Sequence, residues 1–405
     1  MNKDDFAPQM QEQLVSIPGG LWAFVPPPLP DHIEMSPSTV SALADASVAV
    51  GRLSGVGQWM PNPYLLIRPF LRREAVLSSR IEGTQASLSD VMLYEAAPSR
   101  PTGNDDVREV VNYVRALEAA LPDPRPIGLA AIRQLHHILM TGVRGHERSP
   151  GEFRQDQNYI GQHGTPIDQA TYIPPPVFHM HPALEALEGY LSRTGSELPL
   201  LAKIGLSHYQ FEAIHPFLDG NGRVGRLLLS LLLVKLGLIE QPMLYLSAYF
   251  ERERDSYYAR LGAASKEGDL DGWLRFFLTG VCDQADDAVA RASRLFQLRE
   301  SYHQRLQAAR ASSLPIRLVD ELFATPILTI PRARDMLSVT YRAASLNVGK
   351  LVEAGILEEL PGRERNRVFA AREILRLLDA SLKPAARTHH PPDTEENEQQ
   401  TLRLT

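Results

Sequence analysis

The residue types that could carry out chemistry gather in one stretch, residues 215–226, which reads HPFLDGNGRVGR. An apolar run with helical character, Leu200 to Ile214, leads into it and meets Pro216. A residue that precedes proline is disfavoured in the α region, so we expect the helix to end at His215. An imidazole at an exposed helix end has an unperturbed pKa near neutrality and suits a general base.

The rest of the stretch has the features of an anion site. Gly220 and Gly222 flank Asn221, a spacing that permits the positive φ angles of a nest of backbone amides. A second helix should begin near Gly222, and the free N–H groups and positive dipole end of its first turn attract anions. Arg223 and Arg226 lie three apart on that turn, so they share a face and can hold different phosphates.

Asp219 adds a hard oxygen ligand beside this anion site. Mg²⁺ on a di- or triphosphate is usually held by one or two carboxylates together with phosphate oxygens. An ordinary polar loop with a capping asparagine and solvated arginines is the alternative. So many distinct chemical roles within one short stretch favour the phosphate site.

The stretch resembles the signature of Fic-domain proteins, HPFx(D/E)GNGRxxR, and matches it at every defined position. That family transfers AMP from ATP to a protein hydroxyl. The resemblance implies that His215 deprotonates a target Ser, Thr or Tyr, and that Asp219 holds Mg²⁺ against the phosphates of ATP. It also implies a nucleotide pocket with Arg226 at the terminal phosphate, lined by Gly220, Asn221, Gly222, Arg223, Val224, Gly225 and Arg226.

A second segment, LSSRIEG at residues 77–83, fits the inhibitory motif of the same family, (S/T)xxxE(G/N). Gly83 has the character of a helix C′ residue, so Glu82 falls in the last turn, where the helix dipole disfavours an anion. That placement suggests a cationic partner, although a solvated surface glutamate is the alternative. Ser78 lies four residues earlier, on the same face. The resemblance implies that Glu82 pairs with Arg226 and blocks the terminal phosphate.

Two further features follow from the same resemblance. Residues 157–176 contain two short β-prone runs around a glycine-containing tip, which predicts a hairpin. In Fic proteins a hairpin here, after a PGxFR-like segment, docks the target backbone, so we expect a target protein to bind this flap, residues 158–173. Tyr258 is implied in the adenine pocket. Several relatives place an asparagine shortly after it, where this chain has Ser265 or Lys266, which leaves base selectivity open.

Composition places the chain among ordinary globular proteins. Its 405 residues are 44% hydrophobic, enough for a sizeable core and two or three domains. A net charge of −6 argues against a mainly electrostatic nucleic-acid binder. The lone cysteine, Cys282, excludes an internal disulfide and fits a reducing compartment. The apolar run near Leu227 to Ile239 is interrupted by Ser230 and Lys235 and is too short to span a bilayer, so we expect a cytoplasmic protein without membrane contact.

Periodicity predicts a mainly α fold: a Fic helical-bundle core with a small β-hairpin flap, followed by a C-terminal winged helix-turn-helix. Residues 1–35 show few periodic signals and include a polyproline arm, Pro26 to Pro30. Helical patterns follow at 38–53, 67–82, 105–121, 127–141 and 249–266. We expect an N-terminal helical region with the inhibitory helix (1–120), a Fic catalytic domain (121–300), a winged-helix domain (310–381) and a disordered tail (382–405).

The predicted winged helix has helices at 330–337 and 341–354 and a wing formed by 356–360 and 365–369. Its charge is nearly balanced, with ten basic and nine acidic residues between 315 and 380, whereas a DNA reader usually has a basic surface. Weak DNA binding and protein docking or dimerisation therefore remain open. The candidate DNA contacts are Arg342, Asn347, Lys350, Arg363, Arg365 and Arg367.

The leading hypothesis is a Mg²⁺-dependent protein adenylyltransferase that modifies a target protein and itself and is autoinhibited by Glu82. One alternative is a transcriptional regulator in which the nucleotide site senses ATP. Another is a different reaction on the same fold: removal of AMP, transfer of UMP or phosphocholine, or phosphorylation. A homodimer is implied by the resemblance alone.

Overall fold

The computed structural model describes residues 1–59, 64–97, 105–162, 164–193, 195, 197–309, 311–361 and 367–380. These residues form mostly α-helices with small antiparallel sheets, the fold class that the sequence predicts. The α-helices are α1 (Pro37–Trp59), α2 (Tyr64–Ile81), α3 (Leu88–Ala96), α4 (Asp105–Ala120), α5 (Leu129–Met140), α6 (Val177–Ser192), α7 (Leu200–Ile214), α8 (Asn221–Lys235), α9 (Ser247–Arg252), α10 (Arg254–Lys266), α11 (Leu270–Ala308), α12 (Ser313–Ala324), α13 (Ile330–Leu337), α14 (Tyr341–Glu353) and α15 (Arg372–Asp379). The strands are β1 (Leu14–Ile17), β2 (Leu21–Phe24), β3 (Ile327–Thr329), β4 (Glu358–Glu359) and β5 (Val368–Ala370).

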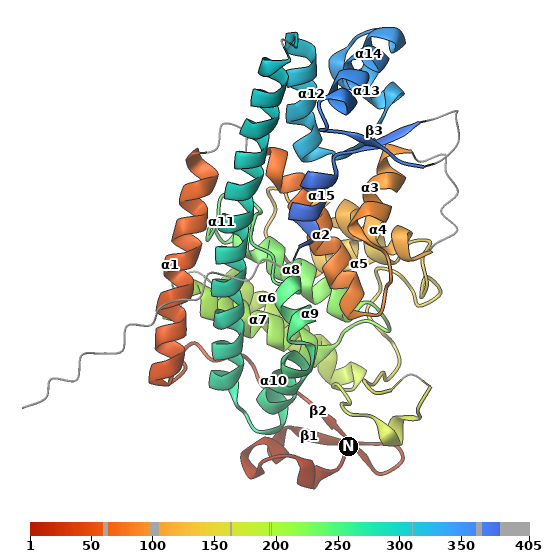
Figure 1. Ribbon diagram of the computed structural model, residues 1–405. Helices are drawn as coiled ribbons and strands as arrows, with labels where there is room; N and C mark the ends of the chain where they lie inside the picture. The colour runs from red at the N-terminus through yellow and green to blue at the C-terminus, as the bar shows by residue number, and fades with distance from the viewer. Residues whose placement is uncertain are drawn as a thin grey trace, which may run out of the picture.

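Helices α7 and α8 form the centre of the molecule and carry the 215–226 stretch between them (Figure 1). Both are buried on almost every face, because apolar residues continue around the whole helix rather than along one stripe. Helix α11 runs along much of the height of the molecule, with α1 packed beside it (Figure 1). None of the helices that the structure describes is long and apolar enough to cross a membrane.

The connection between α7 and α8 follows the backbone prediction in part. Helix α7 ends at Ile214, two residues before Pro216, and His215 adopts a left-handed conformation with φ 49°. Gly220 also has a positive φ, 78°, immediately before α8. Gly222 does not use the positive φ that its residue type permits, because it lies in the first turn of α8. A side chain at 222 would instead collide with the Glu82 carboxylate, so the glycine permits a close approach.

The expected flap hairpin forms only in part. One antiparallel bridge joins Ile160 to Tyr172, and a 3₁₀ helix, Ile167–Gln169, lies between them. The second run is paired elsewhere, since the Ile173 carbonyl accepts a hydrogen bond from the Phe24 amide at 2.9 Å. Three prolines follow at 174–176 and cannot donate to a ladder, so two full strands do not form.

That partner strand belongs to an N-terminal hairpin that periodicity did not predict. Strands β1 and β2 pair antiparallel, with Leu14 opposite Phe24, and the hairpin has a small apolar core shared with Ile173. The four-residue strands are too short to give a clear alternating pattern. Similarly, the helical pattern predicted at 249–266 is broken at Glu253, which separates α9 from α10.

Residues 313–361 and 367–380, the C-terminal module, contain α12 to α15 and a sheet of strand order β3-β5-β4. The helices predicted at 330–337 and 341–354 are present as α13 and α14. One hydrophobic cluster extends from Leu29 to Leu378, so the module shares its core with the rest of the chain. The wing tip, with Arg363 and Arg365, and the tail 382–405 lie outside the described residues.

One of the exposed DNA contacts predicted on this module, Asn347, is wrong. Asn347 is buried, and its amide donates to the Ala343 carbonyl one turn earlier. Asn347 lies on the face of α14 that packs against the core of the module. The sequence pattern alone did not show which face of this helix is buried. Arg367 is ion-paired with Glu359 on the neighbouring strand. Arg342 and Lys350 are exposed as expected.

Candidate functional site

His215 has the geometry of a general base. Its Nδ1 lies 3.3 Å from the Glu212 carbonyl, which can only accept, so Nδ1 carries the hydrogen and Nε2 presents a lone pair. Burial lowers the pKa of His215 to about 4, and the hydrogen bond to Glu212 offsets only part of that shift. The imidazole is therefore neutral, as a proton acceptor must be.

Two side chains hold the His215 backbone in this position. The Arg154 guanidinium donates to the His215 carbonyl at 3.0 Å and also reaches the Pro175 carbonyl at the base of the flap. Asn158 donates to the His215 carbonyl at 3.1 Å and to the Phe217 carbonyl at 2.8 Å. The base and the flap therefore share one buried frame. The PGxFR-like segment that contains Arg154 was the sequence signal for this arrangement.

Asn221 closes the turn between α7 and α8. The backbone N–H groups at the start of α8 form the candidate anion site, which we call the cradle. The Asn221 side chain accepts from the Phe217 amide and donates to the Phe217 carbonyl, both at 2.8 Å. Its amide group is thus used within the protein. The first turn of α8 is the candidate anion cradle, because the N–H groups of residues 221–223 precede the first helical hydrogen bond, from Val224 to Gly220.

Val224 and Gly225 occupy less direct positions than expected. Val224 is buried in the core, and its amide already bonds to the Gly220 carbonyl at 3.0 Å. A side chain at Gly225 would collide with the Glu212 carboxylate. Both residues therefore pack against the protein interior at the start of α8.

Asp219 lies at the open edge of the cradle, with its side chain 46% exposed. Its Oδ1 accepts from the Gly220 amide at 2.6 Å and lies 3.7 Å from the Arg223 guanidinium. No cluster of three or more metal-ligating side chains occurs among the described residues. A single exposed carboxylate fits Mg²⁺ carried on a nucleotide, where phosphate oxygens supply most ligands.

His136 was missed by the sequence reasoning, which treated its helix only as an apolar pattern. The Gly151 amide donates to His136 Nδ1 at 2.8 Å, so Nε2 carries the hydrogen and donates to the Asp219 carbonyl at 3.0 Å. The ring stacks on Phe217 with centroids 3.7 Å apart. Burial lowers the pKa of His136 to about 4, so the ring stays neutral in this role. It fixes the peptide that precedes the cradle.

The predicted pairing of Glu82 with Arg226 is confirmed. Arg226 Nη2 lies 2.6 Å from Glu82 Oε1, and the same guanidinium donates to the Ser78 hydroxyl and carbonyl, each at 2.9 Å. Gly83 has φ 93°, as expected for a residue just after a helix. Burial alone would raise the pKa of Glu82, but the charge and hydrogen bond of Arg226, together with the charges of Arg223 and His215, outweigh it and lower that pKa. The carboxylate is therefore ionised and occupies the arginine.

Arg223 also has a carboxylate partner, which our sequence analysis did not predict. Its Nη1 lies 3.2 Å from Oε2 of Glu109 on α4, and both side chains are almost completely buried. The signal available in the sequence was an acidic residue between Val107 and Val110 on an otherwise apolar helix face. Without knowledge of helix packing, it could equally be a solvated glutamate.

Tyr258, the residue predicted in the adenine pocket, lies on α10. Its ring is 45% exposed, while the neighbouring Tyr257 is buried and hydrogen-bonds His208 at 2.8 Å. Burial raises the pKa of Tyr258, and the negative charge of Glu82 raises it further. Ser265 is buried against Tyr209 and is not available to a base.

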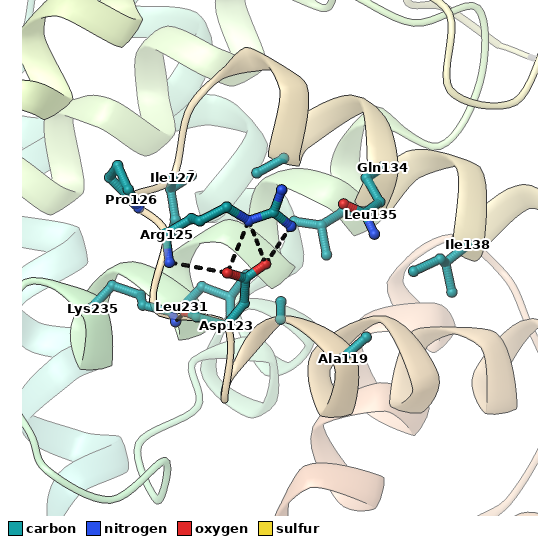
Figure 2. A pocket seen from close by; sticks show the side chains of 12 residues that line it. Ala119, Asp123, Arg125, Pro126, Ile127, Gln134, Leu135, Ile138, Leu231 and Lys235 are labelled. Carbon is teal, nitrogen blue, oxygen red and sulfur yellow. Dashed lines mark hydrogen bonds and ion pairs between the residues drawn. The ribbon is translucent and has the colours of Figure 1, made fainter.

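A cavity of about 40 Å³ lies between α4, α5 and the end of α8, away from this site (Figure 2). Lys235 lines it at the last residue of α8, whereas the cradle is at the first, roughly 20 Å away along the helix. Asp123 and Arg125 pair with each other at its rim, as Figure 2 shows. The cavity is not part of the nucleotide site.

Comparison with known proteins identifies the relatives of this chain. Residues 40–122 match the model of the Fic/DOC family N-terminal region, and residues 126–233 match the model of the Fic/DOC family. Proteins named protein adenylyltransferase Fic from Drosophila willistoni and Drosophila melanogaster are each 32% identical over 164 residues. These matches cover 40% of this chain but only 29% and 30% of the two relatives.

Solved structures share the fold. A Fic family protein from Desulfovibrio desulfuricans G20 aligns with a TM-score of 0.55 and 20% identity, covering 85% of this chain and 98% of that one. A variant of Fic-1 from C. elegans aligns with a TM-score of 0.50 and 21% identity, covering 65% and 74% of the two chains.

Proposed function

Because this chain belongs to the Fic/DOC family over residues 40–122 and 126–233, we propose that it is a protein adenylyltransferase. It transfers AMP from ATP to Ser, Thr or Tyr hydroxyls of a target protein and of itself, and Glu82 restrains it. The observation that carries this proposal is the contact of Glu82 with Arg226 directly against Gly222 in the anion cradle. A carboxylate occupies the place where an anionic substrate group belongs.

The reaction uses few groups of this chain. The target hydroxyl transfers its proton to Nε2 of His215 while its oxygen attacks the α-phosphorus of ATP. The bond between the α-phosphorus and the oxygen bridging to the β-phosphate breaks, and pyrophosphate leaves. The amides at the start of α8 and the guanidinium of Arg223 stabilise the charge on the phosphates. Mg²⁺, when bound by Asp219 and the phosphates, would neutralise the charge of the leaving group.

Binding of the terminal phosphate at Arg226 requires Glu82 to leave. Pairing to a buried charged partner of this kind contributes about 1.5–3 kcal/mol, so its removal should change activity by about ten- to a hundredfold. We expect Glu82→Gly to raise self-labelling from α-labelled ATP by that factor and His215→Ala to abolish it in the same background. Equal labelling of the unaltered chain and Glu82→Gly would reject the inhibitory role of Glu82 in this proposal.

The isotope position separates the related reactions. Label from the γ-phosphate should not enter protein, since only a kinase would transfer it. Removal of AMP is the second candidate, favoured by the partial exposure of the Glu82 carboxylate (35%) beside the cradle, where it could act on water. A chain labelled in advance and then freed of ATP would lose AMP only if Glu82 is intact. Stable label in both forms would exclude this second reaction.

The partners follow from the site. A target segment would dock on the flap, where Ile160 and Tyr159 expose part of their apolar side chains. The family resemblance adds a protein target and a homodimer to the proposal.

A further inference from the structure

Both phosphate-binding arginines of the cradle are paired with acidic side chains from other helices. The partner of Arg226 is the exposed end of an inhibitory segment, but the partner of Arg223 is Glu109, which is 1% exposed and cannot swing out to solvent. Glu109 therefore does not leave Arg223 to make room for a ligand. A carboxylate this deeply buried must have cationic partners throughout. Arg223 is the buried partner, at Oε2, while the exposed Arg144 lies 3.6 Å from Oε1.

The pair leaves one hydrogen-bond donor of Arg223 unused. The Nε–H of Arg223 is buried and has no hydrogen-bond acceptor among the described residues, although Nη1 is bonded to Glu109. A guanidinium has five donors in a fixed fork, so holding one corner sets the direction of the others. An unpaired buried donor at the N-terminal turn of α8 is the complement of a phosphate oxygen.

The same carboxylate oxygen also binds the inhibitory segment. The Thr84 hydroxyl donates to Glu109 Oε2 at 2.9 Å, and Thr84 is fully buried. Thr84 lies two residues after Glu82, and the next amide, of Gln85, donates to Asp106 one turn earlier on α4. The end of α2 is therefore fastened to α4 immediately beyond the carboxylate that contacts Arg226.

We propose that Glu109 is a positioning residue with two functions. It directs the Arg223 guanidinium toward the nucleotide phosphates, and through Thr84 it holds the segment after Glu82 so that Glu82 stays on Arg226. This inference rests on the proposed function, because it assigns Arg223 to ATP and Glu82 to inhibition. It predicts opposite effects for two changes made at the two ends of one hydrogen bond.

Glu109→Gln tests the first function in the Glu82→Gly chain, where the brake is absent. The amide preserves size and an acceptor for Thr84 but loses the charge that orients Arg223. We expect the Kd for Mg·ATP, measured by calorimetry, to rise about tenfold, since one charge-assisted hydrogen bond is lost. We expect KM for ATP to rise in parallel while kcat changes less. Asp105→Asn, an exposed carboxylate on the same helix, is the matched control and should leave both unchanged.

Thr84→Val tests the second function in the chain that retains Glu82. It removes the hydroxyl with almost no change of shape and leaves the Glu109–Arg223 pair intact. We expect Mg·ATP to bind about five- to tenfold more tightly, because the blocked state loses one hydrogen bond to a carboxylate. Thr84→Ser keeps the hydroxyl and should behave like the unaltered chain. In the Glu82→Gly background Thr84→Val should have no further effect on the Kd.

The two readouts separate this inference from the proposed function. Failure of every variant to transfer AMP, with ATP bound normally, would reject the adenylyltransferase and leave the binding predictions to be judged on their own. An unchanged Kd for Glu109→Gln in the released chain would overturn the inference, as would an unchanged Kd for Thr84→Val in the intact chain. If Glu109→Gln does not fold, the comparison of Thr84→Val with Thr84→Ser still decides.

Discussion

At the scale of single residues, a backbone hydrogen bond sets the tautomer of both His215 and His136. Each ring has one nitrogen assigned by a backbone group, a carbonyl for His215 and an amide for His136, so the tautomer is set without any other side chain. The consequences differ. His215 is left with a lone pair where a substrate hydroxyl can approach, while His136 uses its second nitrogen on the Asp219 carbonyl and only supports the turn.

The pH dependence of the reaction follows from the pKa of His215. Burial lowers that pKa to about 4, so the neutral base is present above about pH 5 and is lost only as the pH falls toward 4. Glu82 raises the pKa of His215, so its removal shifts the transition lower still. We expect kcat/KM of Glu82→Gly to stay constant between pH 6 and 8, measured as initial rates of AMP incorporation. If kcat/KM instead fell to half of its maximal value near pH 6.5, the histidine pKa would be unshifted and this assignment would be contradicted.

At the scale of secondary structure, α14 decides what the C-terminal module can bind. Its outer face presents Leu346, which is 62% exposed, and Tyr341 at its first residue, with Arg342 and Lys350 beside them. Asn347, the side chain best suited to reading adenine, points into the module instead. A recognition helix for DNA needs polar side chains directed at base edges, whereas apolar groups on the outer face suit a protein surface.

We therefore expect weak, sequence-independent DNA binding at most. In a gel-shift experiment with the full chain, any complex formed at low salt should disappear near physiological ionic strength and be displaced equally by unrelated DNA. Leu346→Ser should leave that behaviour unchanged. A complex that resists excess unrelated competitor at physiological salt would instead establish the transcriptional regulator.

At the scale of the whole molecule, α2, α11 and the C-terminal module share one hydrophobic core. Arg291 of α11 pairs with Asp287 at 2.9 Å and donates to the carbonyls of Leu377 and Leu378 at the end of α15. Asp287 lies 3.9 Å from Arg73 on α2, the helix that leads to Glu82. The hydrophobic core is continuous across these elements.

A shared core predicts that these parts unfold together. We expect calorimetry to show one transition whose calorimetric and van't Hoff enthalpies agree, despite the size of the chain. Arg291→Ala should lower the free energy of unfolding by about 3 kcal/mol or more, because Asp287 and the carbonyls lose a buried partner. Two separate transitions, with the C-terminal module melting alone, would show that the boundary expected near residue 310 divides independent domains.

The sequence by itself determined the site's local framework. The stop of α7 before Pro216, the positive φ at Gly220 and the spacing of Arg223 and Arg226 depend on rules that act within a few residues, and the structure contains all three. The family resemblance added the pairing of Glu82 with Arg226, which no local rule could provide.

Only the tertiary structure decided which distant groups meet. Glu109 and Arg223 are 114 positions apart, and their contact depends on how α4 packs against α8. The N-terminal hairpin took the hydrogen bond that the flap was expected to keep, since strand pairing is not local. Asn347 faced inward because the packing of α14 determined which side of that helix was free. In each case the local sequence was compatible with several partners for the group, and the packing of the folded chain selected one of them.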